Sequence, residues 1–354
     1  MLTADGCRAR RQRFLDRLRP AGPVLLGDPL HLRYFANFHV EAQSLGADFG
    51  GFLLLRPDGH ATLFHDARVP KTAELAHADE RKPVPWYDGQ SPGVGSRRMI
   101  LQPVVQQNGG RIHDSLADPG CADVYAITSE MRRAKDADEV SLLKVCMAAG
   151  DAGHAWARAN VKPGMTELDV YAGICGAVYA NLGHWAVVYG DFTVSTGSKK
   201  RGGPPTPHVL AAGETLILDF SVVVQGYRSD FTNTLVVGGQ PTAEQQNIFG
   251  LCAMAIEAGA AVLRAGAMCQ AVFDAVDAVL GGKLVHHAGH GLGIQHPEAP
   301  FLVRHSTETL VAGDVVTLEP GLYVDGVGGV RLEHDYLVTA TGCEQLSGHV
   351  LSLT

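Results

Sequence analysis

The 354-residue sequence contains no long uncharged hydrophobic run: hydrophobic residues make up 46% of it, and no stretch approaches the roughly 18 residues that a membrane helix needs. We therefore predict no membrane partner. Charge is also sparse, at 19% of residues with a net charge of −8, so we expect no nucleic-acid partner. The seven cysteines are an odd number and include no Cys-x-x-Cys pair. This usage favours reduced thiols and predicts a cytoplasmic protein.

The chain also lacks a Ser-His-Asp or Cys-His constellation, a phosphate-binding loop and zinc-finger spacing. The sequence therefore gives no support for catalysis by a serine or cysteine nucleophile. What it does contain in unusual density is imidazole. Residues 286–300, HHAGHGLGIQHPEAP, hold four histidines and one glutamate in a stretch with little helical or strand periodicity.

The length predicts two domains of roughly 100 to 200 residues each, and we place their boundary near residue 127. Before it, strand-like runs at 23–26, 51–55 and 61–64 alternate with helical or polar segments, which predicts an α/β domain in residues 1–127. Residues 128–354 carry the chemical motifs. The predicted fold class is a mixed α/β (α+β) protein.

The second domain repeats one order of elements. A capping box at residues 136–139 opens a helix, another helix starts at 166, and two β-rich runs surround a turn at 225–226. A second capping box at 242–245 then opens another helix pair, and residues 314–338 contain two more strands. This order predicts an internal duplication, although literal identity between the halves is low.

Two aspartates lie in the first β-rich pair. If the hairpin turns at Gln225-Gly226, Asp219 opposes Thr232, and Asp219 and Asp230 become diagonal neighbours on one face, roughly 7 to 8 Å apart. Two carboxylates on a buried face repel each other and lose hydration, a cost that is removed if they share cations. The alternative is that one of them faces solvent or makes a turn hydrogen bond, as single aspartates usually do.

The second β-pair offers two more acids, Glu319 at the end of one strand and Glu333 in the returning strand. Four carboxylates and a histidine suit Mn²⁺, Fe²⁺, Co²⁺ or Zn²⁺. Bridging carboxylates suit two ions about 3.5 to 4 Å apart that share a water of lowered pKa. The sequence thus predicts a dinuclear metal centre with a hydrolytic nucleophile.

The strings DFSVVVQGYRSDFTNT, GHGLG, EPGLY and GVRLEHD resemble signatures of the M24 metallopeptidase family, which has a pita-bread fold. The spacings of 11, 29 and 14 residues within them are similar to those of its prolidase branch. The resemblance covers residues 128–354, and DPLHLRYFANF makes residues 1–127 similar to the creatinase-type domain. It implies a metal-ligand set of Asp219, Asp230, His290, Glu319 and Glu333, with Glu319 also carrying a proton.

The resemblance also implies residues around the substrate. His286 and His296 are catalytic candidates, although a structural role is the alternative for His286. The candidates for contact with the substrate are Tyr227, Arg331 and His208. For His287 we favour a structural role.

Three departures from the family pattern affect the substrate rather than the metal. Pro297 occupies a position where the family has histidine, His208 comes later than the family's loop histidine, and Asn233 replaces an arginine.

The sequence therefore predicts a dinuclear metallohydrolase that cleaves an amide bond in a dipeptide or short peptide, with Xaa-Pro peptides as the first choice and a metal-bridged hydroxide as the nucleophile. Manganese is the first expected metal, and cobalt, zinc and iron are alternatives. The resemblance implies a homodimer. Two other functions remain open: an enzyme of the same fold acting on a small non-peptide metabolite, by amide or amidine hydrolysis or by lyase chemistry, and a non-catalytic binding protein.

Overall fold

The computed structural model describes residues 1–40, 50–93 and 95–354, and it divides the chain into two compact units, Met1–Arg132 and Arg133–Thr354. The division follows α5 (Cys121–Met131), so the boundary predicted near residue 127 lies inside this helix. Within the described residues, no helix has both the length and the apolar character needed to cross a membrane.

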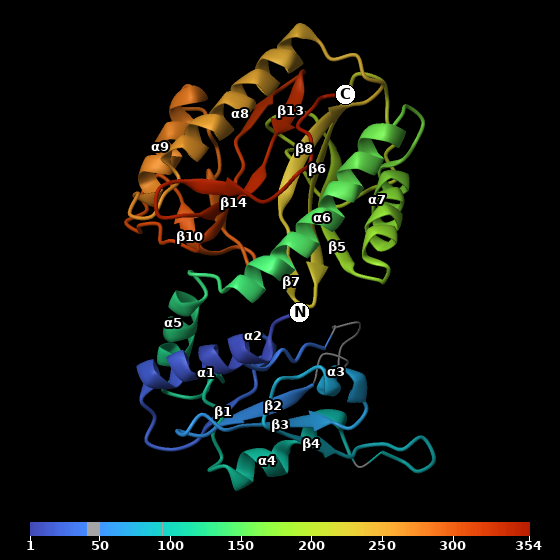
Figure 1. Ribbon diagram of the computed structural model, residues 1–354. Coiled ribbons are helices and arrows are strands. Elements are labelled where there is room, and N and C mark those ends of the chain that lie inside the picture. The colour runs from blue at the N-terminus through green and yellow to red at the C-terminus, as the bar shows by residue number, and fades with distance from the viewer. Residues whose placement is uncertain (41–49, 94) are drawn as a thin grey trace. The chain divides into compact units, whose positions relative to one another are not determined.

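The first unit is built on one sheet with the strand order β1-β2-β3-β4. The strands predicted at 23–26, 51–55 and 61–64 are present as its first three members, paired antiparallel, while β4 pairs parallel to β3. The remaining elements are helical (Figure 1). The bounds are α1 (Ala4–Leu18), β1 (Val24–Leu26), α2 (Pro29–Ala36), β2 (Gly51–Leu55), β3 (Ala61–Asp66), α3 (Pro70–Glu74), β4 (Glu80–Val84), a 3₁₀ turn (Arg97–Met99) and α4 (Gln102–Gln107).

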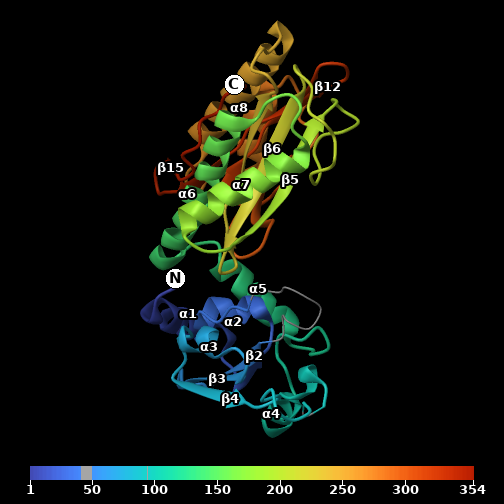
Figure 2. The same ribbon diagram turned by 90° about the vertical axis from the view of Figure 1, so that its right-hand side faces the viewer.

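The second unit places its sheets between two helix pairs. Helices α6 and α7 pack on β5 and β6 (Figures 1 and 2), while α8 and α9 pack on β13 and β10 (Figure 1). The bounds are α6 (Ala137–Asn160), α7 (Glu167–Leu182), β5 (Val187–Ser195), β6 (Thr215–Val224), β7 (Tyr227–Arg228), β8 (Phe231–Val236), α8 (Ala243–Val262), α9 (Cys269–Val279), β9 (Gly289–Gly291), β10 (Glu298–Leu302), β11 (Val315–Leu318), β12 (Gly321–Val324), β13 (Gly328–Arg331), β14 (His334–Val338) and β15 (Cys343–Gln345). The mixed α/β class is confirmed.

Both predicted capping boxes are present. The side chain of Glu139 accepts from the backbone N–H of Asp136 at 2.9 Å, and Gln245 accepts in the same way from Thr242 at 2.8 Å. Each box satisfies backbone donors that the first helical turn leaves unpaired. These local signals explain why the starts of α6 and α8 could be read from the sequence.

The first hairpin has the predicted register. Asp219 pairs with Thr232, and the turn residues Gln225 and Gly226 both have positive φ, 51° and 85°. This turn geometry matches the right-handed twist of the flanking strands. Strand β5, which we did not predict from the sequence, pairs along β6 and carries Asp191 opposite Asp219.

The second β-pair differs from the two strands predicted for residues 314–338. The chain forms four short strands, in which β11 pairs with β14 and β12 pairs with β13 in a separate sheet. Pro320 has no N–H to donate to a β-ladder, so the pairing between strands is interrupted there. Its carbonyl accepts from the backbone N–H of Leu332 at 3.2 Å, at the point where the chain passes between the two sheets. Glu319 and Glu333 lie at these two changes of sheet, beside the first hairpin.

Candidate metal centre

Three carboxylates converge where the two β-pairs meet. Asp219 lies in β6, and Asp230 directly precedes β8. Glu333 is tied to the first hairpin by Thr232, whose carbonyl accepts from its backbone N–H at 3.0 Å and whose hydroxyl donates to its carboxylate at 2.6 Å. One oxygen from each of Asp219, Asp230 and Glu333 lies within 4.8 Å of the others. This cluster could hold a cation through oxygen atoms alone.

His290 faces the same centre from β9. Its Nε2 lies 3.6 Å from Oδ2 of Asp230 and 3.5 Å from Oε1 of Glu319. Its Nδ1 lies 3.0 Å from the carbonyl oxygen of Gly291. A proton on Nδ1 satisfies that carbonyl and leaves the lone pair of Nε2 directed at the two acids, as a metal ligand requires.

Glycines on both sides of His290 allow its strand to approach its neighbours. A Cβ at Gly289 would lie 1.9 Å from the carbonyl oxygen of Thr317, and one at Gly291 would lie 2.1 Å from that of Ala299. Both distances are shorter than any real contact of a Cβ atom. The glycines on both sides of His290 therefore have a packing cause, and the structure brings the predicted five side chains to one place.

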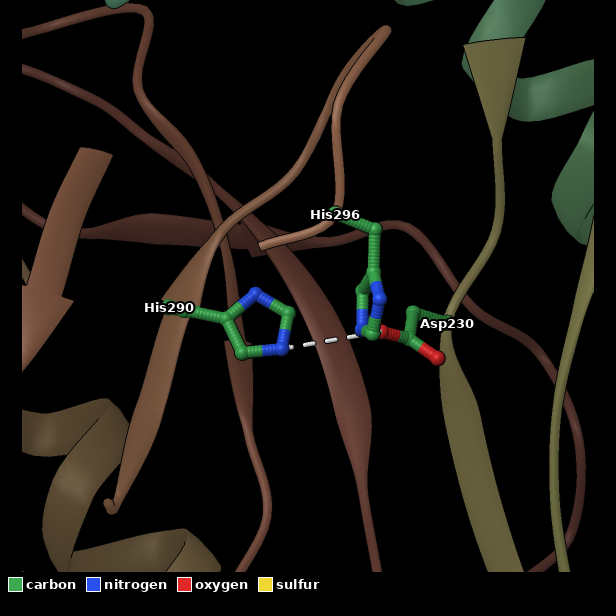
Figure 3. A group of neighbouring side chains, drawn as sticks. All are labelled: Asp230, His290 and His296. Carbon is green, nitrogen blue, oxygen red and sulfur yellow. Dashed lines mark ion pairs between the residues drawn. The ribbon is translucent and has the colours of Figure 1, made fainter. Parts of the chain in front are cut away.

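His296 also enters the centre. Its Nε2 lies 2.6 Å from Oδ2 of Asp230, and its ring centroid is 4.9 Å from that of His290. Figure 3 shows both imidazole rings directed at the carboxylate of Asp230. The sequence places this histidine one residue earlier than the family pattern, yet its side chain reaches the acid cluster.

His287 is the residue that sequence reasoning missed. Its Nδ1 lies 3.0 Å from Oε1 of Glu319, and its ring centroid is 5.3 Å from that of His290. It precedes β9 in a segment without regular structure, so neither a 2-residue nor a 3.6-residue period relates it to His290. The sequence offered only the proximity of His287 to two other histidines as a signal.

Arg331 and His286 are brought to the centre as well. Arg331 Nη2 lies 2.5 Å from Oδ2 of Asp219, and its Nη1 donates to the hydroxyl oxygen of Tyr323 at 3.0 Å. Nε2 of His286 lies 3.1 Å from the same hydroxyl oxygen. Tyr323, which the sequence analysis did not single out, therefore links two of the expected residues.

Two expected substrate residues lie elsewhere. Tyr227 is fully buried and is not part of the cavity wall, because its hydroxyl donates to Oε1 of Glu139 at the start of α6, at 2.8 Å. His208 pairs with Glu214 at 3.0 Å outside the cavity. The carbonyl of His208 accepts from the N–H of Glu167, which holds this segment at the start of α7. The substrate roles expected for Tyr227 and His208 do not agree with these positions.

A cavity of about 370 Å³ opens over the centre. Its walls combine the acids and histidines with aromatic, proline and arginine side chains. The lining also includes Tyr189, Gly190, Asp191, Arg201, Ser221 and Pro297.

The acids repel one another strongly. Burial, together with Asp230 and Glu319, raises the pKa of Asp219 to about 6, although Arg331 opposes the shift. Burial and the same neighbours raise the pKa of Glu333 well above its ordinary value. Burial would also raise the pKa of Glu319, but His287 and His290 lower it to about 2. A buried surplus of carboxylates facing imidazole nitrogens fits divalent cations by both charge and donor type.

Such a set of acids and imidazoles in an open cavity defines the class of metal-dependent hydrolases. Residues 141–340 match the model of metallopeptidase family M24, and the chain belongs to this family of metal-dependent peptidases. It is 30% identical over 342 residues to an uncharacterised peptidase of Staphylococcus saprophyticus, which covers 91% of this chain and 93% of that protein.

Solved structures share the fold. An Xaa-Pro dipeptidase from Bacillus anthracis superimposes with a TM-score of 0.78 at 24% identity and covers 98% of this chain and 99% of its own. A prolidase from Pyrococcus horikoshii OT3 has the same TM-score at 20% identity, with the same coverage of both chains. The expected pita-bread fold and the membership of family M24 are confirmed, and the protein is a metallohydrolase.

Proposed function

We propose that this protein uses two divalent metal ions to hydrolyse the amide bond before proline in dipeptides or short peptides. The observation that carries the proposal is the convergence of Asp219, Asp230, His290, Glu319 and Glu333 beneath one open cavity. In this proposal Asp219, Asp230 and Glu333 would hold one ion. Asp230, His290 and Glu319 would hold the other.

Ions bound in this way would supply Lewis-acid polarisation of the substrate carbonyl and a lowered pKa for water. The side chains of this chain carry the remaining steps. Glu319, whose pKa is lowered to about 2, is ionised at neutral pH and accepts a proton at Oε1 from the attacking water. His286 and His296 both line the cavity and would stabilise the negative charge that develops on the carbonyl oxygen.

The side chains that line the cavity suit a short peptide substrate with a free carboxylate. Tyr189, Pro297 and Tyr323 offer apolar surface that suits a prolyl ring, and Arg201 adds a positive charge stacked 5.5 Å over the ring of Tyr323. Structures named as an Xaa-Pro dipeptidase and a prolidase share the fold. Arg201 would then replace the loop histidine that this chain lacks.

Purified protein tests the proposal directly. Its metal content is measured by elemental analysis, and hydrolysis is followed for Ala-Pro, Leu-Pro, a tripeptide with proline second, a dipeptide without proline and a panel of small amides. We expect cleavage of the Xaa-Pro dipeptides and its loss in Asp230→Asn. Protein that holds two ions and cleaves no amide would refute the hydrolase, and cleavage confined to small amides would establish the metabolite alternative.

The proposal also includes the identity of the metal ions and the oligomeric state of the protein. Manganese is the first metal to supply, because carboxylates dominate the set, and cobalt, zinc and iron follow. A homodimer and a cytoplasmic location remain predictions from the sequence. Light scattering of the purified protein would test the former, and fractionation of source cells the latter.

A further inference from the structure

A second, smaller cavity of about 90 Å³ adjoins the cavity over the proposed centre. Arg201 and Tyr323 line both cavities. Successive Cα atoms of a peptide lie about 3.8 Å apart, so a substrate can pass from one cavity to the other within one or two residues. We call the smaller one the side cavity, and its other lining residues include Ser198, Lys283, Val285 and Leu322.

The wall that the two cavities share is held in place by Arg331. Nη1 of Arg331 donates to the hydroxyl oxygen of Tyr323 at 3.0 Å and to the carbonyl oxygen of Arg201 at 3.2 Å. The guanidinium of Arg201 in turn lies 5.5 Å over the ring of Tyr323. The shared wall is therefore a restrained surface along which a substrate can be positioned.

The side cavity carries positive charge. Arg201 and Lys283 are both exposed, and neither forms an ion pair with a carboxylate in the described part of the chain. The acid that follows β12, Asp325, is engaged by Ser198, whose backbone N–H and hydroxyl donate to its Oδ1 at 2.9 and 2.6 Å. Lysine and arginine make charge-assisted hydrogen bonds to carboxylates. The side cavity can therefore bind an anionic group.

The rest of the side cavity is aliphatic and small. Val285, Leu322 and Val324 contribute to its lining. A cavity of roughly 150 Å³ is large enough for benzene, so the side cavity fits a small aliphatic side chain better than an aromatic ring. Aliphatic surface beside two cations matches a small aliphatic amino acid with a free terminal carboxylate.

We propose that the side cavity binds the residue after proline, so that the preferred substrates are tripeptides of the form Xaa-Pro-Yaa. Yaa is small and aliphatic, and its terminal carboxylate pairs with Lys283. Hydrolysis adds one water across the Xaa–Pro bond and releases the amino acid Xaa and the dipeptide Pro-Yaa. This inference rests on the proposed function and adds a preferred length of the substrate.

Lys283 distinguishes tripeptides from dipeptides because it lines the side cavity and does not line the main cavity. The carboxylate of a dipeptide belongs to the proline and lies in the main cavity beside Arg201. The carboxylate of a tripeptide lies one residue further along the chain. An amide at the end of the tripeptide keeps the length and removes the charge, so it separates these two contributions.

Hydrolysis by the wild-type protein tests the preference with Ala-Pro, Ala-Pro-Val, Ala-Pro-Val amide and Ala-Pro-Trp. We expect the highest kcat/KM for Ala-Pro-Val. Cleavage of Ala-Pro together with an equal or lower kcat/KM for Ala-Pro-Val would overturn the role of the side cavity and leave the proposed function intact. Failure to cleave any of these peptides would refute the proposed function itself.

Variants of Lys283 supply an independent readout. Lys283→Met should raise KM for Ala-Pro-Val by roughly 2- to 5-fold, the range for an ion pair at an exposed side chain. Lys283→Glu should raise it further by repulsion, while both variants leave Ala-Pro and the tripeptide amide nearly unchanged. Lys162→Met, at an exposed lysine outside both cavities, is the matched control. An equal response of the tripeptide and its amide would contradict the proposal.

Discussion

Nη2 of Arg331 lies 2.5 Å from Oδ2 of Asp219, so a buried positive charge stands among the clustered carboxylates. The same nitrogen lies 2.6 Å from Oδ2 of Asp191 in β5, the strand that pairs along β6. This guanidinium offsets part of the repulsion that raises the pKa of Asp219. It therefore supports the metal-free fold, a role that divalent cations would share once they bind.

Replacing Arg331 should destabilise the metal-free protein more than the metal-bound protein. Arg331→Met is expected to lower the free energy of unfolding by about 3 kcal/mol in the presence of a chelator, because it leaves buried carboxylates without their partner. Added Mn²⁺ should recover more stability in the variant than it adds to the wild type. Urea unfolding with and without metal measures both, with Arg264→Met at an exposed position as the control. Equal losses in the two conditions would contradict this account.

His154 gives the stability a defined pH dependence. It is buried in α6 between Phe220 and Phe231, with ring centroids 4.6 and 5.3 Å away, and burial lowers its pKa to about 3. The unfolded chain, with a pKa of about 6.5, binds this proton first. Stability should therefore fall as the pH drops from about 6.5 toward 3, by up to about 1.4 kcal/mol per unit for this group.

The variant His154→Phe isolates this contribution. It keeps an aromatic ring between the two phenylalanines and removes the titrating group, so its unfolding free energy should depend less steeply on pH. Unfolding in urea between pH 7 and pH 5, with a chelator present, gives the two slopes. Parallel slopes for variant and wild type would show that His154 is not the group responsible.

Arg201 should decide how the free carboxylate of a dipeptide is held. Removing a charged hydrogen-bond donor costs about 1.5 to 3 kcal/mol, so Arg201→Ala should raise KM for Ala-Pro by roughly 10- to 100-fold with little change in kcat. The amide of the same dipeptide, which has no carboxylate, should show a much smaller effect. If both substrates respond equally to the substitution, the carboxylate is not bound by Arg201.

The glycine before the central histidine should be intolerant of any side chain. Gly289→Ala places a Cβ 1.9 Å from the carbonyl oxygen of Thr317, so β9 must move and carry His290 with it. We expect a loss of about 2 to 3 kcal/mol of stability, together with weaker metal binding.

A second glycine provides the matched control. Gly176→Ala in α7 meets no atom within 4 Å and should stabilise the helix by roughly 0.5 to 1 kcal/mol. Thermal melting and metal titration of both variants test the contrast. Wild-type metal affinity in Gly289→Ala would contradict the packing argument.

Local signals in the sequence predicted the parts of the fold that neighbouring residues decide. The capping boxes at the starts of α6 and α8, and the turn at Gln225-Gly226, each involve residues only a few positions apart. This β-turn also sets the register of the hairpin, which places Asp219 opposite Thr232. These elements were predictable because hydrogen bonds within one turn or one hairpin determine them.

The second β-pair is a case that local sequence signals did not predict correctly. Its strands change sheets at Pro320 and Leu332, and the change depends on contact with the first hairpin through Thr232. No period within residues 314–338 encodes that contact. The segment therefore forms four short strands where we predicted two, although Glu319 does follow the first of them as predicted.

By itself the sequence predicted the four acids and the histidine that the structure brings together. Strand alternation relates the two aspartates, and the resemblance of its motifs to those of family M24 singles out His290, because both are properties of the chain alone. Only the tertiary structure decided that His287 and His296 also face this centre and that Tyr227 and His208 do not. The reason is physical: the direction of a side chain outside regular structure depends on contacts with distant segments, here Glu319 for His287 and Asp230 for His296.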